Sequence, residues 1–160
     1  VASPTCLILT RQKTKKQQAR LSSEIKKGGY ALRSHSNPDL ILIATGSEIG
    51  LAQDVADALE KINISVKVVS MPCVEAFRAQ TDAYKAELLP SHIPKVAIEA
   101  GASQPWFEWV GAEGLVIGLD HFGLSGPGGQ VLDYCGFKVE SIVEKVAHKF
   151  DFVAYEGEKK

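Results

Sequence analysis

An apolar segment that ends in a glycine turn constrains the fold of this chain more than any other feature. Residues 40–44 are continuously apolar, and Thr45, Gly46, Ser47 and Glu48 follow directly. A strand that is apolar along its whole length is typical of a parallel sheet covered by helices on both faces. The hydroxyl and glycine residues after it are typical of a turn that leads into a helix. The end of such a strand is the usual place of a ligand site in an open parallel sheet.

The composition agrees with one globular domain. Of the 160 residues, 45% are hydrophobic and 23% are charged, which excludes a disordered or fibrous protein. The net charge of −1 gives no indication of nucleic-acid binding or of an anionic membrane surface. No apolar stretch approaches the roughly 20 residues that cross a bilayer, and the first residues lack the pattern of a signal peptide. We therefore expect a cytoplasmic protein whose partners include neither nucleic acid nor a membrane.

The cysteine and histidine residues do not form a metal-binding pattern. The three cysteines, Cys6, Cys73 and Cys135, are odd in number and far apart, which predicts free, buried or half-buried thiols. Neither two histidines nor a histidine and a carboxylate have the spacing of metal ligands. His121 follows the last predicted strand, where a loop side chain is in place for a functional contact.

From residue 28 onward, apolar strands alternate with amphipathic helices. The Asn-Pro-Asp turn at residues 37–39 predicts that the first two strands pair antiparallel. Asp82 is expected to cap its helix, and Thr45 with Glu48 matches a capping box. The alternation predicts a three-layer α/β/α domain with a mainly parallel sheet. The predicted strands are 29–33, 40–44, 66–70, 96–99 and 115–118, and the predicted helices are 47–62, 83–89, a short one that begins at Pro105, and 139–150.

The residues before this domain have a different character. Residues 5–10 are predicted to form a buried strand, and lysine and arginine recur between Arg11 and Lys27 with Glu24 as the only acid. Such a run is typical of a solvated, mobile linker. Arg11 differs because a guanidinium at the end of a strand suits a phosphate group, which it binds with two hydrogen bonds. A lone strand cannot bury itself, so we expect it to belong to a preceding domain of a longer protein.

Nucleotide-binding and hydrolase motifs do not occur. Gly46 and Gly50 do not fit Gly-x-Gly-x-x-Gly, and Ser125 does not stand in Gly-x-Ser-x-Gly. Three large aromatic side chains crowd one short helix, which is compatible with core packing or with contact to another subunit: Trp106, Phe107 and Trp109.

The order of short motifs along the chain resembles the C-terminal region of transketolases. The similarity runs from about residue 4 to residue 150 and is carried by residues 10–12, 28–30, 44–48, 68–72, 89–90, 99–101, 122–127 and 136–137. The resemblance implies that residues 1–27 are the end of a pyrimidine-binding domain with the linker. Residues 28–150 would be the C-terminal domain, and residues 151–160 a polar tail. It also implies a five-stranded mixed sheet with one antiparallel strand.

The resemblance further implies a function. Transketolases transfer a two-carbon ketol unit from a ketose phosphate to an aldose phosphate, a step of the pentose phosphate pathway, with thiamine diphosphate and a divalent metal (Mg or Ca). In the family, the contacts to both cofactors belong to the two preceding domains. No catalytic, cofactor-binding or metal-binding residue is therefore expected in this chain, which should fold without being active alone. Arg11 matches the family's arginine for the substrate phosphate, and a homodimer is implied.

Two alternatives remain open. The first is a non-catalytic interaction or regulatory module that binds an anion or a partner at residues 45–48 and 99–101, because a helix N-terminus with free N–H groups favours anions. The second is the C-terminal domain of another thiamine enzyme, such as the β subunit of a 2-oxo acid dehydrogenase.

Overall fold

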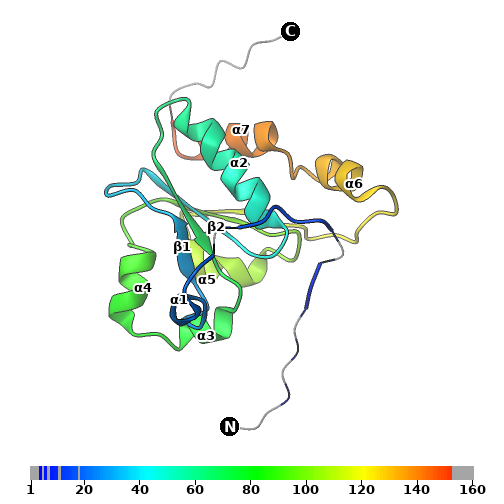
Figure 1. Cartoon of the computed structure of the whole chain (residues 1–160). Coiled ribbons are helices and arrows are strands. Elements are labelled where there is room, and N and C mark those ends of the chain that lie inside the picture. The colour runs from blue at the N-terminus through cyan, green and yellow to red at the C-terminus, as the bar shows by residue number, and fades with distance from the viewer. Residues whose placement is uncertain (1–3, 5, 7, 11, 18, 153–160) are drawn as a thin grey trace.

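Five strands form one mixed sheet in the computed structural model, which describes residues 4, 6, 8–10, 12–17 and 19–152 (Figure 1). Their order across the sheet is β1-β3-β2-β4-β5. This arrangement confirms the predicted α/β fold with one antiparallel strand. The strands are β1 (Tyr30–Arg33), β2 (Leu40–Ala44), β3 (Val66–Ser70), β4 (Lys95–Ile98) and β5 (Leu115–Ile117).

The pairing of the first strand differs from the prediction. Strand β1 is antiparallel, but it pairs with β3, where Tyr30 lies opposite Ser70, and does not pair with β2. Strand β2 lies between two parallel partners, β3 and β4. All five of its residues are 0% exposed, whereas every residue of β1 is only partly buried. The fully apolar strand therefore takes the centre of the sheet, and β1 takes the edge.

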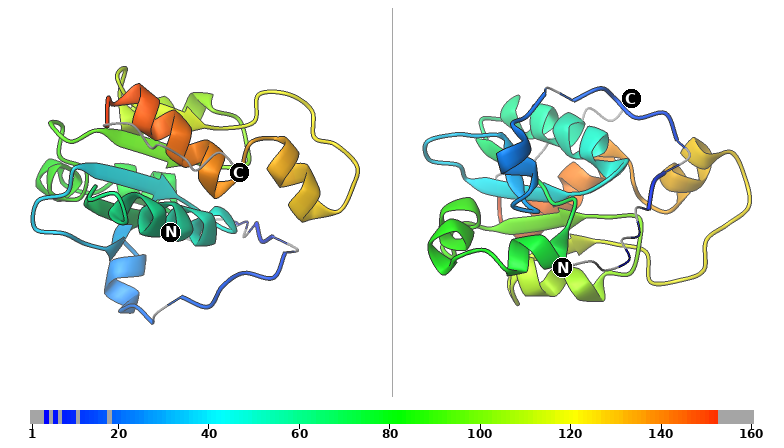
Figure 2. Two further views of the ribbon diagram at one scale, coloured as in Figure 1. Left: turned by 90° about the horizontal axis from the view of Figure 1, so that it is seen from above. Right: turned by 60° about the horizontal axis from the view of Figure 1, so that its bottom comes forward.

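Helices cover both faces of the sheet (Figure 2). Leu40 and Leu42 belong to the core cluster with α2 and α7. Ile41 and Ile43 belong to the opposite cluster, which includes Phe77. Alternate residues of β2 thus face different helical layers, as the geometry of a strand requires. The helices are α1 (Ser22–Ile25), α2 (Glu48–Glu60), α3 (Val74–Arg78), α4 (Asp82–Leu88), the 3₁₀ helix η1 (Gln104–Trp106), α5 (Phe107–Val110), α6 (Gly128–Tyr134) and α7 (Val139–Lys149).

Both predicted helix caps are wrong. The hydroxyl of Thr81 caps α4 by accepting a hydrogen bond from the Tyr84 N–H at 3.3 Å, and Asp82 is the first helical residue. At α2 the N-cap residue is Ser47, whose backbone is already helical and whose side chain makes no capping hydrogen bond. A capping side chain needs an extended backbone to reach the free N–H groups, so this turn prevents a capping box.

The aromatic cluster near Pro105 serves mainly the core. Trp106 is 6% exposed, and the ring of Trp109 packs against that of Phe77 with 5.1 Å between centroids. Phe107 points outward and is 48% exposed. Core packing is therefore confirmed for both tryptophans.

The segment before the domain is attached to it at several points. Lys15 forms an ion pair of 2.6 Å with Asp54 of α2, and a guanidinium nitrogen of Arg20 donates to the carbonyl of Leu32 at 2.6 Å. Among the described residues of the predicted strand at 5–10, none lies in a strand, and Ile8 and Leu9 are 89% and 74% exposed. The prediction of a buried strand is wrong here because these residues have no neighbouring strand to pair with.

The thiols are free as predicted, but the predicted burial is wrong for two of the three. Cys6 and Cys73 are exposed and Cys135 is partly buried. Cys73 is exposed because it stands in the turn before α3 and not in the preceding apolar strand. None of the described helices is long and apolar enough to cross a membrane. Within the described ranges, no three histidine, cysteine, aspartate or glutamate side chains are placed to hold a metal ion.

A carboxylate at the start of β2 connects that strand to the loop after α2. Asp39 accepts hydrogen bonds from the N–H and the hydroxyl of Ser65 at 2.8 and 2.7 Å, and these bonds lower its pKa. A lowered pKa means that the stabilising contribution is present above the usual value of 3.8 and is lost as the pH falls further. We expect Asp39→Asn to reduce the free energy of unfolding at pH 7 by about 1 kcal/mol.

Denaturant unfolding at pH 7 and at pH 2.5 measures this effect. The difference between wild type and Asp39→Asn should shrink at the lower pH, while the exposed Asp133→Asn serves as the control. An equal difference at both pH values would show that the charge of Asp39 does not stabilise the fold.

Candidate functional site

The candidate site lies at the carboxyl edge of the parallel strands. Strands β2 and β4 are neighbours, and Ala44 lies opposite Ile98 at their ends. After β2 the chain passes through α2 to β3 on one side, whereas β4 lies on the other side. The connections leave in opposite directions at this point, which is the usual place of a ligand crevice in an open α/β sheet, here between the turns at residues 45–48 and 99–101. The predicted location of a site is therefore the topological switch point of the sheet.

A buried carboxylate occupies the first position of α2. Glu48 is only 7% exposed, and its Oε1 atom accepts a hydrogen bond of 2.7 Å from the hydroxyl of Ser47. Gly46, with a φ of 55°, makes the turn that brings Ser47 and Glu48 over the end of β2. The negative charge that a helix N-terminus favours is thus supplied by the chain itself.

A second carboxylate faces the same crevice from β4. The Oε2 atom of Glu99 is enclosed and has no hydrogen-bond partner among the described residues. Burial raises the pKa of Glu99 to about 7, with a further contribution from the charge of Glu48. The backbone of this turn is fixed, because the Glu99 N–H donates to the carbonyl of Ile117 at 3.1 Å and its carbonyl accepts from Gly101 at 2.8 Å.

The polar side chains of the loop after β5 make hydrogen bonds to residues other than Glu48 and Glu99. Asp120 accepts hydrogen bonds from the N–H and hydroxyl of Ser103 at 2.8 and 2.7 Å, and these bonds lower its pKa. His121 is exposed, and its Nδ1 atom lies 2.8 Å from the carbonyl oxygen of Phe122. The structure therefore gives His121 a local backbone contact, and the predicted functional contact stays a prediction.

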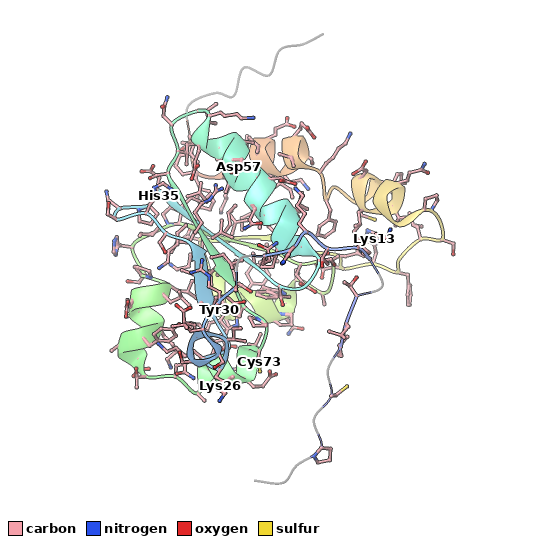
Figure 3. All side chains as sticks on the ribbon, viewed as in Figure 1. Lys13, Lys26, Tyr30, His35, Asp57 and Cys73 are labelled. Atoms are coloured by element: carbon pink, nitrogen blue, oxygen red, sulfur yellow. The ribbon has the colours of Figure 1, made fainter. Side chains whose placement is uncertain are left out.

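The linker reaches the same edge of the sheet. A cavity of about 180 Å³ lies beneath it, and its lining includes Lys15 from the linker, Gly46 before α2, Gly50 within α2, and Ser70 at the end of β3. In Figure 3 the labelled Lys13 lies on this part of the chain, away from the sheet. Arg11, the predicted phosphate-binding residue, lies outside the described residues.

A separate ion-pair cluster joins β1 to the far end of α2. An Arg33 nitrogen lies 3.3 Å from the Glu60 carboxylate, and His35 Nε2 lies 2.9 Å from the same group. Arg33 also pairs with Asp57, and the labels of His35 and Asp57 in Figure 3 mark this region. These contacts hold the edge strand to the helix, and none of them involves Glu48 or Glu99.

The arrangement is chemically unsuited to an anion. Two carboxylates in one poorly solvated crevice repel negative charge and favour a proton or a cation. This argues against the alternative of an anion site at residues 45–48. The sequence pattern placed Glu48 in a capping box and Glu99 in a loop that binds an anion or a partner, and it missed the pairing of the two acids. Both acids follow buried strands, and this position was the available signal.

Comparisons with known proteins agree with the geometry. The family described as "Transketolase-like TK C-terminal domain" matches residues 28–138. The chain is similar to Transketolase 1 of Pasteurella multocida (47% identical over 149 residues) and to the transketolase of Aquifex aeolicus (41% over 152 residues). These alignments cover 89% and 92% of this chain but 22% of each relative. The solved transketolase of Leishmania mexicana superimposes with a TM-score of 0.82 at 34% identity, covering 89% of this chain and 21% of that one.

Proposed function

The chain belongs to the transketolase family through its C-terminal domain, and from this membership we propose that it serves an enzyme transferring a two-carbon ketol unit between sugar phosphates. The donor would be a ketose phosphate and the acceptor an aldose phosphate. The observation that carries the proposal is the 47% identity over 149 residues to a transketolase. The chain spans about a fifth of the length of such relatives, so the activity is that of a longer protein.

Thiamine diphosphate and a divalent metal, Mg²⁺ or Ca²⁺, would supply the chemistry of this transfer. The site of this chain does not fit thiamine diphosphate, because the Glu48 and Glu99 carboxylates oppose a diphosphate, and the described residues include no group of three candidate metal ligands. The proposal therefore assigns the cofactor contacts to other parts of the enzyme.

The role proposed for this chain in substrate binding rests on Arg11. Its guanidinium would bind the phosphate group of the sugar, since the fork of N–H donors matches phosphate oxygens. The proposal places residues 1–27 at the end of a preceding domain, residues 28–150 in the C-terminal domain and residues 151–160 in a tail. The exposed Ile8 and Leu9 support this division, because such side chains need an apolar partner. A homodimer is the proposed assembly.

A chimera tests the proposed function. In it, this chain replaces the corresponding fifth of the Pasteurella multocida transketolase, and ketol transfer is measured with saturating cofactor and metal. We expect turnover by the chimera, with the unmodified relative as control, and no turnover by the 160-residue chain alone. A folded, cofactor-bound chimera without ketol transfer would contradict the assignment, and turnover by the isolated chain would contradict the division of labour.

A further inference from the structure

Among the residues that the structure describes, the carboxylate pair at the switch point has no counter-charge. Glu48 receives one hydrogen bond, from Ser47, and Glu99 Oε2 receives none from the described residues. No lysine, arginine or histidine forms an ion pair with either glutamate within the described part of the chain. A buried ionised carboxylate without donors is strongly disfavoured, because it loses hydration and gains nothing in return.

The described charged side chains of the neighbouring elements make their contacts elsewhere. From the loop after β5, the Asp120 carboxylate is turned to Ser103, and His121 contacts its own loop. From the linker, the Lys15 ammonium is held by Asp54. Among the described residues, the charged group that raises the pKa of Glu99 is Glu48, which carries the same sign.

The missing donor is supplied most simply by a proton. A protonated Glu99 removes one of two like charges and gains an O–H that can donate a hydrogen bond. Two carboxylates in one site commonly share a proton for this reason. We propose that Glu99, enclosed beside Glu48, keeps its proton in the folded protein well above the pH at which a solvated glutamate loses it, and that loss of this proton weakens the two turns at the switch point.

The proton makes the stability of the domain dependent on pH in a defined direction. The folded state binds more protons than the unfolded state between the usual pKa of 4.5 and the raised value of about 7. Stability from this group is therefore complete at low pH and is lost as the pH rises through this window. After allowance for partial solvent access, we expect the folding equilibrium constant to fall about 30-fold from this pair between pH 5 and pH 8.

The experiment measures the δ-carboxyl carbon shifts of the 160-residue chain during a pH titration, together with denaturant unfolding at pH 5 and pH 8. Glu99 is expected to titrate near pH 7. Glu99→Gln should remove the roughly 30-fold loss of the folding constant, because glutamine is neutral at both pH values. Glu48→Gln should lower the titration midpoint of Glu99, since it removes the like charge.

Glu113→Gln is the matched control, because Glu113 is exposed and outside the crevice. It should keep the pH dependence of the wild type. A Glu99 midpoint at its usual value of 4.5 would overturn the proposal, and so would an unchanged midpoint in Glu48→Gln. The titration of the wild type decides the matter even if a variant fails to fold.

Discussion

In the intact enzyme, Arg11→Ala is expected to raise the KM for phosphorylated sugars by about 100-fold. The expected change for unphosphorylated sugars is less than about threefold, because the side chain would contact only the phosphate. Two charge-assisted hydrogen bonds from one guanidinium account for a loss of this size. The measurement is kcat/KM for matched phosphorylated and unphosphorylated acceptors, with the cofactors saturating.

Two further variants separate binding from structure. Lys13→Ala removes an exposed cation two residues away and should leave both KM values near those of the wild type. Arg11→Lys keeps the charge but not the forked donors, so it should recover only part of the loss. An equal decrease of kcat/KM for both acceptors in Arg11→Ala would assign Arg11 a structural role.

The strands of the sheet were predictable because local sequence patterns identify them. Strand β2 has the predicted bounds, and β3 also has them, since both are apolar runs set off by polar turns. The partner of β1 was not predictable from its own sequence. The pairing depends on which strands lie inside the sheet and need a hydrogen-bonded neighbour on both edges. Short helices were missed: α3 has five residues and α6 has seven, which is too few for a clear helical period. Helix α6 also begins with two glycines, Gly128 and Gly129, which disfavour a helix.

The position of the candidate site was predictable, but its chemistry was not. The glycine turn after β2 indicates a switch point, and the strand order places one between β2 and β4. Glutamates are mostly exposed in proteins, so a sequence gives no reason to expect Glu48 at 7% exposure or an enclosed oxygen on Glu99. The two acids come together because β2 and β4, the strands that they follow, are neighbours in the sheet. Glu48 and Glu99 are 51 positions apart in the sequence.

Gly28→Ala is expected to destabilise the domain by at least about 4 kcal/mol, which is a large part of the roughly 5–15 kcal/mol that stabilises a typical domain. Gly28 has a φ of +80° and lies against the start of α3. A methyl group there would be 2.3 Å from the Cys73 carbonyl oxygen and 2.5 Å from the Phe77 nitrogen. Both are backbone atoms, joined by the first hydrogen bond of α3 at 3.1 Å, so neither can turn aside as a side chain does.

The predicted loss also follows from what α3 holds in place. Phe77 is 0% exposed, and its ring packs on Tyr84 and Trp109, so a shift of α3 opens this face of the core. Gly46→Ala is the matched control: its φ is +55°, but nothing lies within 4 Å of the added methyl group. It should cost only about 1–2 kcal/mol, the strain of a left-handed backbone. Thermal and denaturant unfolding of both variants measures the difference, and equal losses would show that backbone conformation, and not the contact between the linker end and α3, limits residue 28 to glycine.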